Sequence, residues 1–234
     1  MKLMILPHAG GSARGYCFLK KLLPSDITLV PLEPAGRGSR IKEPCFENLS
    51  LCAEDILNYY NEDIWEDDYA LFGHSMGTLL VTELTRLLSE RGFTPPKHIF
   101  LSGRCAADEQ INLINTKNPS DEEVLEFFAH HNMVPESVLQ NKEMCKMFSK
   151  VIGADVRMAE SCVLLPAKYQ FPCDISILYG KDDPFLKKCN MNDWKRFTKH
   201  NCEVYSFPGG HFYYTEQKEA VCAVISKKLQ TKEI

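Results

Sequence analysis

The sequence predicts a single α/β domain with a mostly parallel central sheet and helices on both faces. The length of 234 residues, with 44% hydrophobic and 25% charged residues, suits one globular domain that covers residues 1–234. Short apolar runs of strand length alternate with stretches of helical periodicity along most of the chain. Because parallel strands need a crossover that packs on the sheet, this alternation indicates a parallel sheet covered by helices.

Six runs of apolar or β-branched residues are each long enough for one strand. They are nearly continuous in such residues, as strands buried on both faces should be, and turn-forming residues follow them. The predicted strands are residues 3–6, 27–30, 69–72, 98–101, 175–178 and 204–207. Helical periodicity follows the third run at 76–91 and returns at 214–229, so we expect helices there.

The interval between the fourth and fifth predicted strands breaks this alternation. Ser120 and Glu123 form a capping-box pattern ahead of one helical stretch. A second helical stretch carries one apolar stripe, formed by Met144, Met147, Phe148, Val151 and Ile152. An insertion of about 70 residues between Gly103 and Asp174, on the side of a sheet where loops carry sites, is a candidate lid. A helical subdomain with only a packing role is the alternative.

The segment Gly73-His74-Ser75-Met76-Gly77 supplies the strongest chemical signal. It follows the third predicted strand and opens the helix at 76–91, which is the strand-turn-helix setting of a nucleophilic serine. Such a turn strains the serine backbone, and flanking glycines remove the Cβ atoms that would clash. We therefore expect the Ser75 hydroxyl above the carboxyl end of the sheet, where open α/β sheets bind ligands.

A serine nucleophile needs a histidine base, and that base needs a carboxylate partner. Of the seven histidines, His211 is the best placed, because it lies in a glycine-rich loop just beyond the last predicted strand. Asp183 follows the fifth predicted strand at the same sheet edge and is the preferred acid, while Asp182 remains the alternative. The chain order of Ser75, Asp183 and His211 is that of α/β-hydrolases, so the sequence predicts this fold.

Two backbone amides should stabilise the oxyanion of such a reaction. One is the amide of Met76, which follows the nucleophile, and the other is expected in the loop after the first strand, where Ala9 is the preferred donor. This loop contains glycines but neither Gly-x-Gly-x-x-Gly nor a Lys-Ser/Thr ending, so a phosphate-binding loop is not favoured.

Four blocks of the sequence together resemble one family. They are residues 6–13, 33–40, 73–77 and 208–212. The chain resembles, nearly end to end, the type II (editing) thioesterases of nonribosomal peptide and polyketide synthases. The vertebrate medium-chain fatty acyl thioesterase belongs to the same group. In the second block Ala35 departs from the usual pattern, and no role is assigned to Arg37.

The resemblance implies a Ser75–Asp183–His211 triad, an oxyanion hole from Ala9 and Met76, and a lid at 107–165. It implies hydrolysis of acyl groups from the 4'-phosphopantetheine thiol of an acyl or peptidyl carrier protein, without a metal or other cofactor. A generic carboxylester or acyl-CoA hydrolase on the same fold is the alternative enzyme. The alternative that is not an enzyme is a catalytically silent interaction module with the same fold.

Composition and charge argue against nucleic-acid binding, a membrane span and a metal site. A net charge of −4 gives no global basic field for nucleic acid, and no apolar run is long enough to span a membrane. The ten cysteines contain no Cys-x-x-Cys pair, and the adjacent His130 and His131 would point to different helix faces, so no metal site is expected. We expect most cysteines to be reduced, buried residues of a cytoplasmic monomer, because the amino terminus does not resemble a signal peptide.

Several basic residues near the two early loops suggest a contact with an acidic carrier protein, although a solvated basic surface is the simpler interpretation. They are Arg14, Lys20, Lys21, Arg37, Arg40 and Lys42.

Overall fold

A six-stranded parallel sheet forms the centre of the computed structural model, which describes residues 1–109, 114, 119–162, 164–166 and 168–230. The strand order is β2-β1-β3-β4-β5-β6, and every neighbouring pair is parallel. All six predicted runs are strands, so the expected sheet is confirmed. The strands are β1 Lys2–Leu6, β2 Thr28–Pro31, β3 Tyr69–His74, β4 His98–Ser102, β5 Asp174–Gly180 and β6 Cys202–Phe207.

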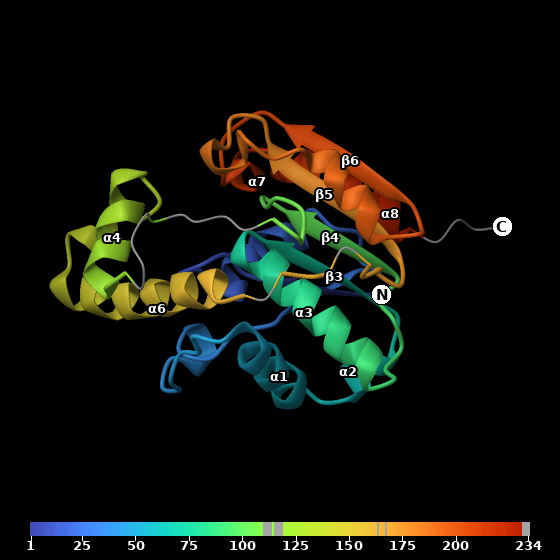
Figure 1. Ribbon diagram of the computed structural model, residues 1–234, viewed down its shortest axis with the longest axis horizontal. Coiled ribbons are helices and arrows are strands. Elements are labelled where there is room, and N and C mark those ends of the chain that lie inside the picture. The colour runs from blue at the N-terminus through green and yellow to red at the C-terminus, as the bar shows by residue number, and fades with distance from the viewer. Residues whose placement is uncertain (110–113, 115–118, 163, 167, 231–234) are drawn as a thin grey trace.

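Helices cover both faces of the sheet, as predicted (Figure 1). Met4 and Leu6 pack into the core under the helices of one face, whereas Leu3 and Ile5 pack into the core of the other, because successive strand residues alternate in direction. The first face carries α1 (Leu49–Tyr59), α2 (Asp63–Glu66), α3 (Met76–Glu90) and η4 (Met191–Phe197). The second face carries η1 (Ala13–Lys21), α7 (Tyr213–Glu216) and α8 (Lys218–Leu229). The helix predicted at 214–229 is thus divided at Gln217.

The carboxyl ends of five strands lie level at one edge of the sheet. The register pairs Leu6 with Gly73, His74 with Ser102, Ser102 with Leu178, and Gly180 with Phe207. The loops that follow β1, β3, β4, β5 and β6 therefore leave the sheet side by side. Every residue predicted to take part in catalysis lies in one of these loops or at its junction with the next helix.

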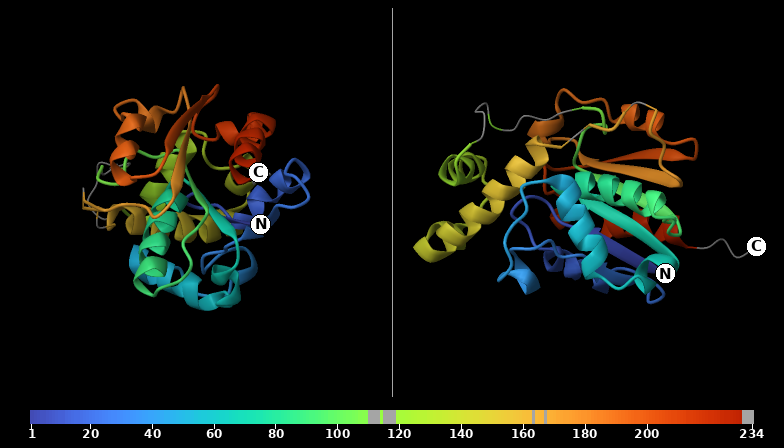
Figure 2. Two further views of the ribbon diagram at one scale, coloured as in Figure 1. Left: turned by 90° about the vertical axis from the view of Figure 1, so that its right-hand side faces the viewer. Right: turned by 60° about the horizontal axis from the view of Figure 1, so that its bottom comes forward.

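The predicted insertion is a group of helices that projects from this edge of the sheet (Figures 1 and 2). It contains α4 (Asp121–His130), α5 (Glu136–Leu139) and α6 (Lys142–Glu160). The Ser120 capping box is present with both of its hydrogen bonds. At the base of the insertion, the amide of Leu165 donates to the carbonyl of Ala107 over 3.2 Å, so its two ends are adjacent.

The apolar stripe of α6 is only partly buried. Val151 and Ile152 are buried, but Met144 and Met147 are 43% and 52% exposed. The reason is visible in Figure 2, where the amino-terminal part of α6 extends beyond the sheet. Periodicity predicts which side chains share a helix face, but it does not predict how far a helix reaches past its neighbours.

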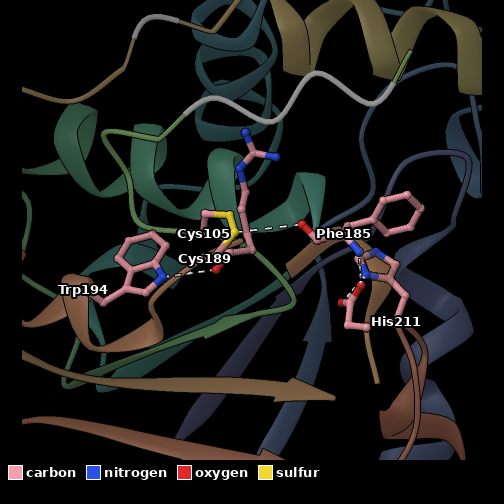
Figure 3. Close-up of a disulfide and its surroundings, with 7 residues drawn as sticks. Cys105, Phe185, Cys189, Trp194 and His211 are labelled. Carbon is pink, nitrogen blue, oxygen red and sulfur yellow. Dashed lines mark hydrogen bonds and ion pairs between the residues drawn. A yellow bond between two sulfur atoms is a disulfide. The ribbon is translucent and has the colours of Figure 1, made fainter. Parts of the chain in front are cut away.

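One pair departs from the reduced state expected for most cysteines: Cys105 and Cys189 form a disulfide with a Cα–Cα distance of 5.5 Å (Figure 3). These residues are 84 positions apart, and no local pattern links them. Four of the remaining cysteines are buried, as predicted: Cys52, Cys162, Cys173 and Cys222. Within the described part of the chain, no helix has the length and apolarity that crossing a membrane requires.

Candidate active site

Ser75 occupies the sharp turn between β3 and α3. Its φ angle of 55° lies in the left-handed region, which is strained for a residue with a side chain. The turn is fixed by the Ser75 amide, which donates to the carbonyl of Ser102 over 2.7 Å. A Cβ atom at Gly73 would collide with the Gly77 carbonyl, and one at Gly77 would collide with the Leu6 carbonyl. The two glycines are therefore required by close backbone packing around the serine.

His211 and Asp183 form a buried hydrogen-bonded pair beside this turn. His211 Nδ1 donates to Asp183 Oδ2 over 2.7 Å, which leaves Nε2 of the neutral ring as the proton acceptor. The Phe185 amide donates to the other Asp183 oxygen over 3.0 Å and fixes the carboxylate. Asp182 is exposed and accepts instead from the Gly209 amide at 3.4 Å. Of the two candidate acids, Asp183 is therefore the one that contacts His211.

A small cavity of about 30 Å³ joins the predicted site residues. Ser75 and His211 both line it, with Ala9 and Met76, the two expected amide donors. The structure thus brings Ser75, His211, Ala9 and Met76 to one cavity, with Asp183 behind the imidazole. The other lining residues come from the loop after β1, from the insertion, and from the loops after β4 and β5. They are His8, Phe128, Met133, Val156, Ala159, Gly103, Arg104 and Phe185.

Two further imidazoles surround the site and are held neutral. His74 Nδ1 lies 2.8 Å from Ser102 Oγ, and its ring centroid is 4.8 Å from that of His211. Burial, and secondly the charge of a protonated His211, lower the pKa of His74 well below its ordinary value. The same two causes lower the pKa of His8 to about 3, with a smaller effect from Arg37. Neither ring competes with His211 for a proton near neutral pH.

Arg37, to which no role is assigned from the sequence, forms a buried ion pair with Asp155 of α6. Its Nη1 and Nη2 atoms lie 2.5 and 2.6 Å from the two carboxylate oxygens, and Asp155 is fully buried. The Gly10 amide donates to the same carboxylate over 2.7 Å. This pair therefore connects the insertion to the loop that carries Ala9. Arg40 is also buried, in contacts with Glu43 and Asp55, so neither arginine belongs to an exposed basic surface.

The remaining candidate ligands do not form a metal site in this state. His130, His131 and His200 are exposed. Within the described residues, potential ligand atoms of Cys105, Glu109 and Cys189 lie within 4.8 Å of one another, but the two sulfur atoms are bonded to each other. A disulfide offers no thiolate to a metal ion.

Comparison with known proteins identifies the family. A family model described as "Thioesterase domain" matches residues 1–229. The chain belongs to the thioesterase domain family. This thioesterase is an α/β-hydrolase-fold enzyme that hydrolyses thioesters.

Thioesterase PikA5 of Streptomyces venezuelae is 28% identical over 98% of this chain and 81% of that protein. The medium-chain S-acyl fatty acid synthase thioesterase of Homo sapiens is 27% identical over 91% of this chain and 80% of that protein. The structure of the type II thioesterase BorB from the borrelidin biosynthetic cluster is 30% identical, covers 98% of this chain and 92% of its own, and has a TM-score of 0.85.

Sequence reasoning missed three residues of this thioesterase's site: Arg104 and Phe185 line the cavity, and Asp155 contacts the loop that carries Ala9. Asp155 interrupts the apolar side of α6, and a buried acidic residue in such a place is a signal of pairing. Arg104 follows a glycine at the carboxyl end of a buried strand, which is a position where ligands bind. Phe185 lies just after Asp183, and its ring packs edge-on against His211 with centroids 5.2 Å apart.

Proposed function

We propose that this thioesterase hydrolyses acyl groups from the phosphopantetheine thiol of a carrier protein, with Ser75, His211 and Asp183 as its catalytic triad. The observation that carries the proposal is the buried 2.7 Å contact between His211 and Asp183 next to the strained Ser75 turn. Ser75 and His211 line the same cavity, so the nucleophile and its base face the same substrate space.

The reaction proceeds in two halves. Ser75 Oγ attacks the thioester carbonyl carbon while His211 Nε2 takes the hydroxyl proton, and Asp183 stabilises the resulting imidazolium. The amides of Ala9 and Met76 stabilise the oxyanion of the tetrahedral intermediate. The C–S bond then breaks, and the sulfur leaves as a thiol with the proton from His211.

Hydrolysis of the acyl-enzyme repeats the same steps with water as the nucleophile. His211 takes a proton from the water as its oxygen attacks the ester carbonyl, and returns it to Ser75 as the C–O bond breaks. The products are a carboxylic acid and the free serine. A thiol with a pKa of roughly 8.5 is a better leaving group than an amine, so little general-acid assistance is required.

We propose further that residues 1–234 form one domain and that the insertion at about 107–165 is a lid over the acyl group. Four insertion residues, Phe128, Met133, Val156 and Ala159, line the cavity together with Ser75. The adjacent ends of the insertion, at Ala107 and Leu165, make it a compact unit on a narrow base. The site is then covered by a part of the chain that does not supply the reacting groups.

A carrier protein is the proposed partner because the resemblance implies it and because relatives include a type II thioesterase of a biosynthetic cluster and a fatty acid synthase thioesterase. A monomer that acts in the cytoplasm is part of the same proposal. The Cys105–Cys189 disulfide is relevant to the proposed cytoplasmic location, because the cytosol keeps most thiols reduced. Thiol alkylation of the protein in fresh cell extract measures whether Cys105 and Cys189 are bonded or reduced in the cell.

The test compares three substrates with the same acyl group: an acyl carrier protein, acyl-CoA and a simple ester. We expect the highest kcat/KM for the carrier protein, and a fluorophosphonate probe should label the wild type but not Ser75→Ala. The matched control Ser137→Ala changes an exposed serine of α5 and should keep both labelling and activity. Preference for the simple ester would indicate a general carboxylester hydrolase instead, and absence of labelling would indicate a silent interaction module.

A further inference from the structure

Arg104 is a buried cation in the wall of the catalytic cavity. It directly follows Gly103 at the end of β4 and lines the cavity with Ser75 and His211. The residue is 7% exposed, and its Nη2 atom is enclosed without a hydrogen-bond partner. A buried guanidinium with an unpaired nitrogen is unusual, because burial removes the water that would otherwise solvate the charge.

The other two buried arginines show what this chain normally supplies to such a group. Arg37 is paired with Asp155, although its Nε atom also lacks a hydrogen-bond partner, and Arg40 is paired with Glu43 and Asp55, so both of these guanidinium groups have a carboxylate in contact. Over the residues that the structure describes, no ion pair is formed by Arg104. Burial lowers the pKa of its guanidinium, but an arginine in a protein stays protonated, so the positive charge remains.

The cavity around Arg104 offers no compensating charge. The other lining residues are His8, Ala9, Ser75, Met76, Gly103, Phe128, Met133, Val156, Ala159, Phe185 and His211, none of them acidic. Asp183 is already paired with His211 on the far side of that ring. Whatever enters the cavity to react with Ser75 therefore meets an uncompensated cation.

The backbone at Arg104 is held firmly in place. Its carbonyl accepts a hydrogen bond of 3.1 Å from Trp194 Nε1, and the next residue, Cys105, is bonded to Cys189 (Figure 3). The preceding Gly103 amide donates to the Leu178 carbonyl of β5 over 2.9 Å. A site whose main chain is fixed on both sides is suited to recognise a ligand without rearrangement.

We propose that Arg104 is a specificity residue that binds a carboxylate carried by the acyl group of the substrate. The thioesterase would then act on short half-thioesters of dicarboxylic acids, of which malonyl is the simplest. The cavity is small in this structure, with a volume of about 30 Å³, so the shortest acyl group of this class is the one to test first. This inference rests on the proposed function, because it concerns the acyl group that Ser75 attacks.

The test compares malonyl and isovaleryl groups on the same carrier protein. Isovaleryl has nearly the shape of malonyl, with two methyl groups in place of the two carboxylate oxygens. For the wild type we expect a higher kcat/KM with malonyl. In Arg104→Met the ratio of malonyl to isovaleryl kcat/KM should fall by about 100-fold, the size expected for the loss of a charge-assisted hydrogen bond. Arg104→Lys should recover part of this ratio.

Arg14→Met is the matched control, because it removes an exposed arginine and should leave the ratio unchanged. Binding of malonate and isovalerate is measured separately, through the rise in the thermal unfolding midpoint of the wild-type protein. We expect malonate to stabilise the protein more than isovalerate does. This measurement needs neither an active enzyme nor a folded variant.

The two proposals fail in different ways. If the wild type hydrolyses isovaleryl but not malonyl, or if malonate stabilises it no more than isovalerate, the Arg104 assignment is wrong while the proposed function stands. An equal loss of both activities in Arg104→Met would also overturn it and would indicate a structural role. If the wild type hydrolyses neither these two thioesters nor the acyl carrier protein of the first test, yet malonate binds selectively, the proposed function fails and the anion site remains.

Discussion

The sheet edge and the helical insertion build the same cavity by different means. At the sheet edge, Ser75, Asp183 and His211 are fixed by strand register and by short contacts with neighbouring loops. The insertion has its own small core, formed by residues such as Val124, Phe128 and Ile152. The proposed reacting groups therefore belong to one packing unit, and much of the cavity wall belongs to another. In such an arrangement, the wall can vary without disturbing the geometry of the proposed triad.

The largest expected effect tests the sheet edge alone. Asp183→Asn should lower kcat by roughly 10⁴-fold, as the equivalent change does in a serine protease, because His211 is then held in the wrong tautomer. The folded protein should remain, since the amide occupies the same space. Asp182→Asn is the matched control and should stay within about twofold of wild type, because this side chain is exposed. Equal losses in the two variants would remove Asp183 from the triad.

The next effect tests the connection between the two regions. Asp155→Asn leaves the Arg37 guanidinium buried without its partner charge, which should lower the free energy of unfolding by about 3–5 kcal/mol. Asp121→Asn changes a partly exposed contact with Arg157 and should cost less than about 1 kcal/mol. Urea unfolding measures both values. Similar small losses would mean that the buried pair does not hold the insertion to the body.

A pH experiment distinguishes the regions by their histidines. His98 in β4 is buried, and burial lowers its pKa from 6.5 to about 4. Between these values the unfolded chain binds the proton and the folded protein does not, so stability should fall as the pH drops from about 6.5 to 4. The expected slope from this group is roughly 1 kcal/mol per pH unit.

His98→Gln should remove that part of the slope, as measured by urea unfolding at several pH values. His130→Gln, in the exposed part of α4, should keep the wild-type slope. A slope that is the same in wild type and His98→Gln would show that other groups control the acid stability.

The smallest effect concerns the insertion alone. Ser120→Ala removes the side-chain cap of α4 and should destabilise the protein by about 1 kcal/mol without changing kcat/KM. Thermal unfolding followed by circular dichroism measures the change, with Ser137→Ala as the control. A single transition that shifts as a whole would show that the two regions unfold together. A new early transition would show that the insertion unfolds by itself.

The sequence predicts the sheet edge well because each of its signals is local. The Ser75 turn is marked by glycines within two residues, and Asp183 and His211 each follow a strand that is visible in the sequence. Parallel topology then brings the strand ends together without further information. The choice between Asp182 and Asp183 needed coordinates, because both residues follow the same strand and only one turns towards the histidine.

Other features depend on contacts between distant residues, which no local pattern encodes. Arg37 and Asp155 are 118 positions apart, and Cys105 and Cys189 are 84 apart. Arg104 likewise lines one cavity with Phe128 and Met133 of the insertion. Single-sequence reasoning finds residues that are marked by their immediate neighbours. It does not find partners that meet only after the chain has folded.

The hydrogen bond between Ala107 and Leu165 has a practical consequence for engineering. Two backbone groups in contact at the root of a segment provide a natural pair of splice points, since a foreign segment whose ends are equally close would leave the sheet undisturbed. Grafting the corresponding stretch from a relative between these two residues would produce chimeras that share one set of reacting atoms and differ in the acyl chains that they accept.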